Sequence, residues 1–394
     1  MTSMKRNLGI TARQSIYSAI NTSTVQVIAI LSLTPSDYGA FSLYYLAFAI
    51  ASSVTYSAVA EAWIRSGRDG RELLPWVQYC TTLLAVAGLA LILVAVAGVL
   101  AGAPALGISF GLAICLTTYR LGARYYSVAV SHFRYVGPAD LIGAIVMVIG
   151  FWALQEVTAA LTALSLAWVG SSLVSVLLSE RPRIDLHFGP RHWVRAHRAS
   201  IGILFLDSAL SDIGTIGVPL LLAPLLGPAK FGVYRAVSSA ALPVRLMLNP
   251  IRPILGGLSV GVFARARTVL VALLGATAIG AAAFLTLAAL ESAPLLASSV
   301  LNALSEYALP VGIFVGGNFL GMLYYLVGRA HFSAKRLLLY RIVETVGAVI
   351  FPVVGYVWSD LTGAIWGYVL VSIVNATFAV GLVGSEDRAT KNYT

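Results

Sequence analysis

Charged residues are scarce in this sequence of 394 amino acids. They make up 11% of the chain, against roughly 25% in soluble domains. Hydrophobic residues make up 59%, and the mean hydropathy is +0.87. This composition excludes an ordinary water-soluble domain. Apolar runs of about 20 residues, long enough to cross a hydrocarbon core of about 30 Å, recur from end to end. The composition therefore predicts an all-α polytopic membrane protein.

Cysteines and catalytic motifs are also scarce. The two cysteines, Cys80 and Cys115, fall inside apolar segments, which argues against a disulfide framework or a thiolate metal site. Three histidines, His187, His192 and His197, are spaced five residues apart. This spacing puts them on no common helical face, and no carboxylate or thiol cluster joins them, so we expect no metal site. We find no phosphate loop, HExxH sequence, nucleophile elbow or dinucleotide fingerprint. We therefore expect neither an enzyme, nor a catalytic residue, nor a cofactor.

The apolar runs divide into twelve candidate membrane spans. Nothing resembling a cleavage site for a signal peptide follows the first run, so we expect it to remain as an uncleaved span. The predicted spans cover residues 10–33, 40–60, 74–100, 106–126, 139–155, 158–178, 200–222, 232–256, 268–290, 307–327, 338–357 and 362–383.

The basic residues indicate the orientation of these spans. If the N-terminus is cytoplasmic, every lysine and arginine falls on the cytoplasmic side or in the inner half of the membrane, except Lys230 and Arg235. The positive-inside rule therefore predicts that both termini are cytoplasmic. It also attributes the net charge of +10 to topology and to contact with membrane lipid headgroups, so we expect no nucleic-acid partner. The connections on the other side are short and leave no room for an extracytoplasmic domain.

The chain contains an internal duplication. Residues 32–42 read Ser-Leu-Thr-Pro-Ser-Asp-Tyr-Gly-Ala-Phe-Ser, and residues 225–235 read Leu-Leu-Gly-Pro-Ala-Lys-Phe-Gly-Val-Tyr-Arg. An offset of 193 places Pro35 on Pro228 and Gly39 on Gly232. Both copies leave one apolar segment, turn at a Pro-x-x-aromatic-Gly loop and enter another. The first copy carries Ser42 at the start of its second helix, where the second copy carries Arg235.

A second pair of similar segments extends the duplication. Residues 125–133 match residues 324–332 at an offset of 199, and both begin with Tyr-Tyr and end with His-Phe. A shift of six spans preserves orientation, so we expect two parallel six-helix lobes related by a pseudo-twofold axis along the membrane normal. The predicted lobes are residues 1–180 and 200–394, joined by a basic cytoplasmic linker at 181–199.

Polar residues at membrane depth are costly unless they meet water or a partner, so they mark candidate functional positions. They recur on the first and second helices of each half, which predicts a water-filled cavity lined by those four helices. The proposed cavity residues that bind substrate are Arg13, Asn21, Gln26, Tyr45, Arg235, Arg245, Asn249 and Arg252.

Acidic residues in the same spans have two possible roles. Asp207 and Asp212 on the seventh helix are either ion-pair partners of the cavity arginines or sites for coupling to H⁺ or Na⁺. Asp140 and Glu344 occupy corresponding places on the fifth and eleventh helices. We expect these two to be structural, paired with arginines at the inner ends of the fourth and tenth helices. Proline should also bend the seventh and eighth helices, at positions 219 and 243.

The two hairpin motifs, residues 33–43 and 226–236, resemble the recurring hairpins of the bacterial lipid-linked oligosaccharide flippases. These form the O-antigen branch of the multidrug/oligosaccharidyl-lipid/polysaccharide exporter superfamily. The resemblance implies a V of two six-helix lobes in the bacterial inner membrane, with a cavity lined by the first, second, seventh and eighth helices. It further implies a polyprenyl-pyrophosphate sugar as substrate, alternating access as mechanism and polysaccharide-assembly machinery as a possible partner. Arginine suits a diphosphate because its donors form a fork.

Three other functions remain open. A small-molecule or drug exporter of the same superfamily would be expected to carry mainly acidic cavity residues, and here arginines outnumber aspartates. A membrane glycosyltransferase would need catalytic carboxylates in sizeable outer loops, which this sequence lacks. The sequence also allows a non-transporting component of a polysaccharide-synthesis complex.

Overall fold

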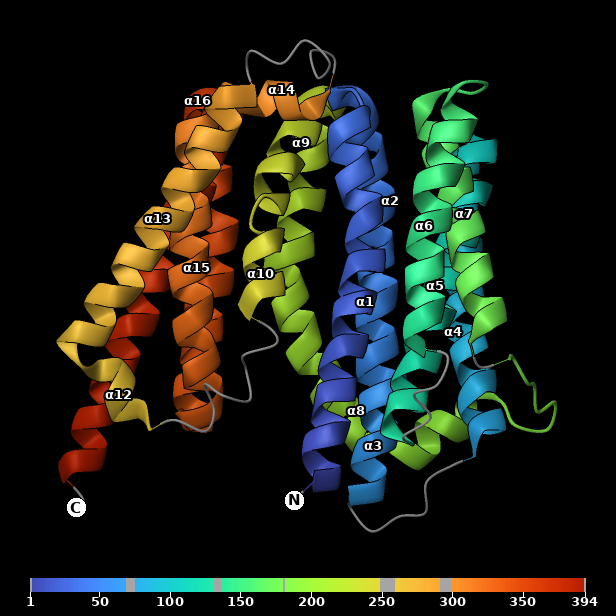
Figure 1. Ribbon diagram of the computed structural model, residues 1–394, viewed down its shortest axis with the longest axis horizontal. Coiled ribbons are helices and arrows are strands. Elements are labelled where there is room, and N and C mark those ends of the chain that lie inside the picture. The colour runs from blue at the N-terminus through green and yellow to red at the C-terminus, as the bar shows by residue number, and fades with distance from the viewer. Residues whose placement is uncertain are drawn as a thin grey trace. The chain divides into compact units, whose positions relative to one another are not determined.

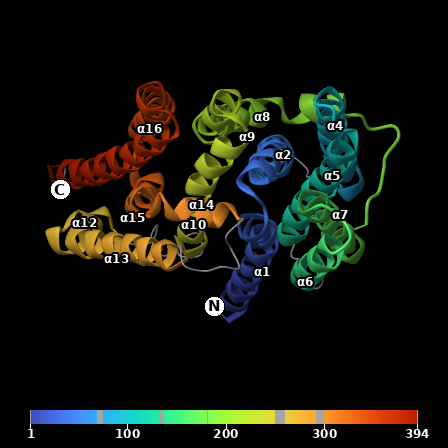
Figure 2. The same cartoon turned by 90° about the horizontal axis from the view of Figure 1, so that it is seen from above.

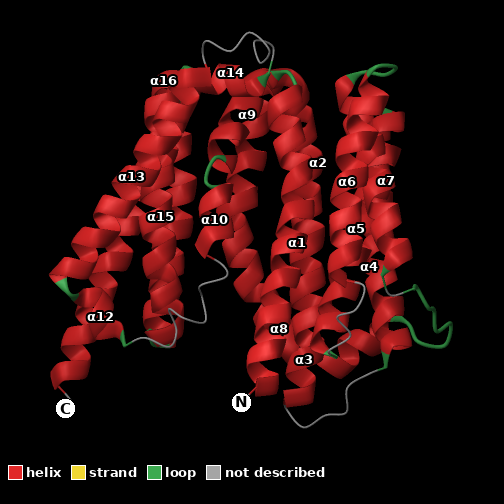
Figure 3. Ribbon diagram, in the orientation of Figure 1, coloured by secondary structure: helices red, strands yellow, loops and turns green. Residues whose placement is uncertain are grey.

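The computed structural model describes residues 2–68, 75–130, 136–179, 181–248, 259–290 and 299–392. All regular structure in these ranges is helical, and no strand occurs in them (Figure 3). The first half comprises α1 (Thr2–Ser32), α2 (Pro35–Val54), a π-helical segment (Thr55–Ala60), α3 (Glu61–Arg68), α4 (Trp76–Leu100), α5 (Pro104–Ala129), α6 (Val136–Gln155) and α7 (Ala160–Leu178). The second half comprises α8 (Pro190–Asp212), a π-helical segment (Ile213–Gly217), α9 (Val218–Ser239), α10 (Leu242–Leu248), α12 (Val260–Ala264), α13 (Ala266–Leu290), α14 (Val300–Ser305), α15 (Ala308–His331) and α16 (Ala334–Asn392).

Nine helical stretches within the described residues are long and apolar enough to cross a membrane. Two of them are far longer than the 20 or so residues that one crossing needs. The stretch Ser200–Val244 contains a break at Gly227, whose φ is 70°, and the stretch Lys335–Arg388 contains a break at Ser359 and Asp360. Each therefore supplies two crossings. With α1, which is not among these nine stretches, this gives the twelve helices expected for the fold, and residues 249–256 of the predicted eighth span lie outside the described residues.

Two compact units divide the chain. The first contains residues 1–29 and 41–212, and the second contains residues 30–40 and 213–394. The tip of the α1–α2 hairpin thus belongs to the second unit, although most of both helices belongs to the first. This division does not test the predicted lobe boundaries at 180 and 200, which stay a prediction.

Helices α4 to α7 form the packed body of the first unit, and they stand side by side in both views (Figures 1 and 2). The α4–α5 turn illustrates how the sequence sets these helices. Gly102 takes a φ of 74°, which glycine adopts without strain, and Pro104 begins α5, where its missing N–H costs nothing. Gly98 and Gly107 then meet backbone to backbone across the two helices.

The predicted linker, residues 181–199, packs against the first unit. The indole of Trp76 donates to the carbonyl of Arg181 at 3.2 Å, and the amide of Arg183 donates to Sγ of Cys80 at 3.2 Å. Trp193 is almost fully buried, and its indole donates to the carbonyl of Ala58 at 2.9 Å. The central basic stretch is therefore held against α4 and the π-helical segment that follows α2.

Helix irregularities occur next to the two prolines singled out in the sequence. Pro219 lies two residues after the π-helical segment Ile213–Gly217, and Pro243 lies two residues after a turn at residues 240–241 that separates α9 from α10. A proline lacks the N–H that would bond one turn back, so a regular helix is disfavoured there. These irregularities agree with the expected bends, which stay a prediction.

Candidate functional site

The two duplicated hairpins contact each other within the second unit. A Cβ atom on Gly39 would overlap the carbonyl oxygen of Pro228. A Cβ atom on Gly232 would overlap the carbonyl oxygen of Pro35. The contact is reciprocal, because the glycine of each hairpin lies against the proline of the other hairpin. We call Pro35–Gly39 together with Pro228–Gly232 the hairpin contact.

Glycine is required at both positions by space rather than by backbone angle, since neither lies in the left-handed region. The neighbouring atoms are backbone, which cannot move aside as a flexible side chain can. Additional bonds surround the contact. The hydroxyl of Tyr38 lies 3.4 Å from Oγ of Ser239, and the amide of Val300 donates to the carbonyl of Leu33 at 2.9 Å. The sequence motif is thus a packing device that lets two chain segments approach backbone to backbone.

Arg235 lies four residues beyond Phe231 on the helix that leaves this contact. One terminal nitrogen donates to Oγ of Ser238 at 3.1 Å. Its Nε is buried and has no hydrogen-bond partner, and no carboxylate pairs with Arg235 among the residues that the structure describes. A partly buried guanidinium with an unused donor offers a binding point for an anion.

Three other cations of the second unit have carboxylate partners, unlike Arg235. Lys230 pairs with Asp360 at the break in α16, Arg336 pairs with Glu386, and Arg341 pairs with Glu344. Lys230 is about half exposed. The sequence predicts that both Lys230 and Arg235 lie near the outer face. Their electrostatic surroundings differ in the structure, because Asp360 pairs with Lys230 and not with Arg235.

A buried ionic cluster lies inside the first unit. Asp140 on α6 pairs with Arg120 and, at 3.3 Å, with Arg124, both on α5. The side chains of Arg120 and Asp140 are 3% and 2% exposed. The amide of Asn21 donates to the carbonyl of Asp140 at 2.7 Å, which ties α1 to the same place. The expected structural role of Asp140, with partners from the fourth helix, agrees with this geometry.

Glu344 has a described partner on its own helix. This partner is Arg341, three residues earlier, at 2.9 Å. Arg341 also donates to the hydroxyl of Tyr325 and lies over its ring, 4.6 Å from the centroid. The expected partner at the inner end of the tenth helix is Arg329, whose side chain lies outside the description, so the pairing of Glu344 between helices stays a prediction.

The remaining predicted site residues have different surroundings. Asn21 and Gln26 are buried in the first unit, and Tyr45 packs among the rings of Phe41, Phe48 and Trp168. Asp212 is half-buried and hydrogen-bonded to Ser53. Arg13, Asp207 and Arg245 lie on described helices, but their side chains are outside the description. Asn249 and Arg252 lie outside the described residues.

The hairpin contact could be found only partly by sequence reasoning. The duplicated motif identifies the two hairpins, but nothing in the sequence says that their tips meet each other. The paired state of Asp140 was more accessible, because a single acid on an apolar helix needs a cation.

Similarity to known proteins is confined to structure. No protein-family model and no curated protein sequence matches the chain. Among solved structures, an inward-facing multidrug resistance MATE family transporter of the MOP superfamily has a TM-score of 0.66 and 15% identity, over 97% of this chain and 99% of that one. The lipid II flippase MurJ in an inward closed conformation has a TM-score of 0.61 and 9% identity, over 95% and 86%.

A third similar structure is a MOP superfamily transporter from Pyrococcus furiosus, whose description reports a reversed polarity of its binding pocket. Its TM-score is 0.57 and its identity 14%, over 98% of this chain and 97% of that one. At such low identities these likenesses establish the fold. The chain is a multi-pass membrane protein with the fold of these transporters.

Proposed function

We propose that this protein belongs to the MOP superfamily and transports an anionic, lipid-linked oligosaccharide across the membrane by alternating access. The substrate class is a polyprenyl-pyrophosphate sugar, and the membrane is the bacterial inner membrane, with both termini cytoplasmic. The protein moves its substrate without chemical conversion. The single observation that carries the proposal is Arg235, a membrane-embedded cation with a buried, unused donor and no carboxylate partner in the described chain.

Energetics favour an anionic ligand at this position. An unpaired charge at membrane depth costs several kcal/mol unless it meets water or a counter-ion, so such residues mark substrate or ion paths. Arg120, Arg124 and Arg341 avoid the cost by pairing with carboxylates inside the protein. Arg235 has no such pair among the residues that the structure describes. In our proposal the pyrophosphate supplies the missing counter-ion, because guanidinium donors match phosphate oxygens in bidentate geometry.

The sequence supplies the other members of the proposed binding set. Arg245 and Arg252 follow Arg235 along the stretch that we predict as the eighth membrane span, and Arg13 lies on the first. We propose that these four arginines bind the diphosphate in turn as the headgroup crosses. Asp207 and Asp212 would then couple the cycle to H⁺ or Na⁺.

The hairpin contact gives the cycle a defined closed state in this proposal. A contact made by backbone against backbone, without large side chains, can separate and re-form without repacking a core. We propose that its separation opens one end of the substrate path. We further propose that the protein assembles with polysaccharide-synthesis proteins.

A drug exporter of the same fold is the second candidate, and the similar MATE structures favour it. For the Pyrococcus furiosus protein, the reversed polarity of the binding pocket is reported to suggest a different function. Such a reversal supports the idea that this fold carries either sign of ligand. The unpaired cation at Arg235 is suited to an anion and would repel an organic cation.

Reconstituted protein can decide between these functions. Proteoliposomes would receive either a fluorescent polyprenyl-pyrophosphate sugar or a fluorescent organic cation. Exposure of the labelled lipid to a membrane-impermeant reductant reports its movement across the bilayer. We expect protein-dependent movement of the lipid-linked sugar and none of the cation. Movement of the cation alone would establish the exporter, and absence of both would favour a structural component of a synthesis complex.

A further inference from the structure

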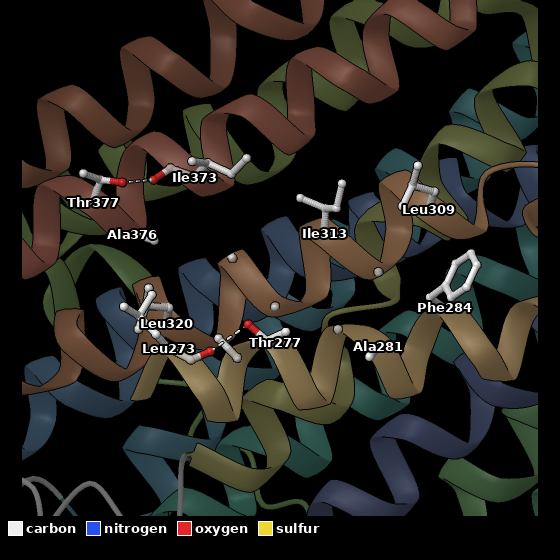
Figure 4. Close-up of a pocket in the computed structure, with 15 residues that line it drawn as sticks. Leu273, Thr277, Ala281, Phe284, Leu309, Ile313, Leu320, Ile373, Ala376 and Thr377 are labelled. Atoms are coloured by element: carbon white, nitrogen blue, oxygen red, sulfur yellow. Dashed lines mark hydrogen bonds between the residues drawn. The ribbon is translucent and has the colours of Figure 1, made fainter. Parts of the chain in front are cut away.

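An apolar groove opens in the second unit between α13, α15 and the last part of α16. Its volume is about 520 Å³. The larger side chains along it are Leu273, Phe284, Leu309, Ile313, Leu320 and Ile373. Its two side-chain hydroxyls, on Thr277 and Thr377, bond to carbonyls of their own helices at 3.0 and 2.9 Å (Figure 4). The side chains of the lining therefore leave no free polar group for a ligand.

The floor of the groove is formed by a close approach of α13 and α15. A Cβ atom on Gly280 would lie 2.6 Å from the carbonyl oxygen of Gly312, and one on Gly312 would lie 2.8 Å from that of Gly280. Small residues allow two helices to pack closely in a membrane. Here the glycines bring the two backbones together, and the larger leucine, isoleucine and phenylalanine side chains line the groove. The space between these side chains is left open.

The groove is elongated along the helices, as a site for a hydrocarbon chain would be. From Leu273 to Phe284 along α13 there are eleven residues, which correspond to about 16 Å at 1.5 Å per residue. In Figure 4, Leu273 and Leu320 lie near one end and Phe284 and Leu309 near the other, so the channel follows the helices.

Exposed positive charge lies beyond one end of the groove. Arg265, just before α13, and Arg267, in its first turn, are exposed six to eight residues before Leu273. Along a helix, this separation is about 9–12 Å. A lipid with its tail in the groove can thus have an anionic headgroup near these arginines.

We propose that this groove holds the polyprenyl tail of a lipid-linked anion, with the phosphate end toward Arg265 and Arg267. The proposal rests on the proposed function and adds a site for the part of the substrate that stays in the bilayer. A carrier lipid of this type has a single long tail, which can lie along the groove, and its anionic end matches the charge of the two arginines.

Selectivity at this site comes from shape. Lipid tails are as apolar as leucine, so transfer from bilayer to groove gains little from the hydrophobic effect, and close packing supplies the preference. Substitutions that fill the channel should therefore weaken binding, while identical substitutions beside it should not.

The test uses photolabelling of the full chain in nanodiscs. The probe is a long-chain polyprenyl monophosphate with a diazirine in its tail, and labelled peptides are identified by mass spectrometry. We expect labels on α13 and α15. Ala281→Trp, which fills the groove, should reduce this labelling roughly fivefold, as overpacking does. Ala282→Trp places the same side chain at an exposed neighbouring position that does not line the groove, and should leave labelling within about twofold of the unsubstituted chain.

Several results would overturn the proposal. These are labelling spread evenly over other membrane helices, equal labelling of the two tryptophan variants, or displacement of the probe by phosphatidylglycerol at the same mole fraction. The last would identify the groove as an ordinary phospholipid surface. If Ala281→Trp does not fold, Thr277→Trp with Ala278→Trp as its control answers the same question.

Failure of this proposal differs from failure of the proposed function. The probe carries neither sugar nor diphosphate, and its labelling requires no transport. Transport of the lipid-linked sugar without groove labelling would contradict the groove alone. Groove labelling without transport would contradict the flippase alone.

Discussion

Gly39 and Gly232 occupy equivalent places in two copies of one hairpin, and each lies against the carbonyl of the other copy's proline. A duplication visible in the sequence has thus produced a contact between its own two copies. Neither glycine has room for a Cβ atom, since backbone atoms are in the way.

The first prediction follows from this lack of space. Gly39→Ala or Gly232→Ala should prevent the hairpin contact from closing fully. Overpacking at a rigid site costs roughly 1–3 kcal/mol, which lowers the population of the closed state about fivefold or more. We expect transport in proteoliposomes to fall by a similar factor. The control is Gly88→Ala on α4, where an added Cβ atom meets nothing within 4 Å. Equal activity of all three variants would contradict a role for the contact.

A second prediction concerns movement at the same place. The hydroxyl of Tyr38 lies 3.4 Å from Oγ of Ser239. In a chain with Cys80→Ala and Cys115→Ala, the pair Tyr38→Cys and Ser239→Cys should be bridged by a short bifunctional thiol reagent. We expect bridging to stop transport and cleavage of the bridge to restore it. Each single-cysteine variant treated in the same way should keep its activity. Continued transport by the bridged protein would show that transport does not require the hairpin contact to open.

A third prediction concerns the ionic cluster of Asp140 with Arg120 and Arg124. Asp140→Asn leaves two guanidinium groups without their carboxylate in the interior of the first unit. Removing one partner of a buried pair typically costs about 3–5 kcal/mol. We therefore expect a marked fall in the thermal unfolding midpoint in detergent. Asp360→Asn removes the partner of Lys230 at an exposed position and should change the midpoint little. Equal effects of both substitutions would contradict the structural role assigned to Asp140.

Much of the fold could be predicted because membrane spans are read from composition. A long apolar run leaves few alternatives to a helix, since every backbone polar group must bond within its own segment. The helix irregularities beside Pro219 and Pro243 have a local cause as well, since a proline has no N–H to bond one turn back.

Contacts between distant residues were harder to predict. Glu344 was expected to pair across helices, and the sequence did not reveal its described contact with Arg341 on its own helix. Asn21 was assigned to a cavity because it is polar at membrane depth, and the structure shows its amide bonded to the carbonyl of Asp140. Polarity in a span indicates that a partner exists, but it does not distinguish a ligand from a neighbouring helix.

The central claim is that Arg235 binds the diphosphate of the substrate, and flipping by Arg235→Ala proteoliposomes tests it most directly. Charged hydrogen bonds contribute roughly 1.5–3 kcal/mol, so we predict a loss of about tenfold or more in the rate at which the labelled polyprenyl-pyrophosphate sugar crosses the bilayer. Arg235→Lys should retain part of that rate, because it keeps the charge without the fork. Lys230→Ala, five residues away, should flip normally, since Lys230 already has Asp360 as its partner. An unchanged rate for Arg235→Ala would contradict the account.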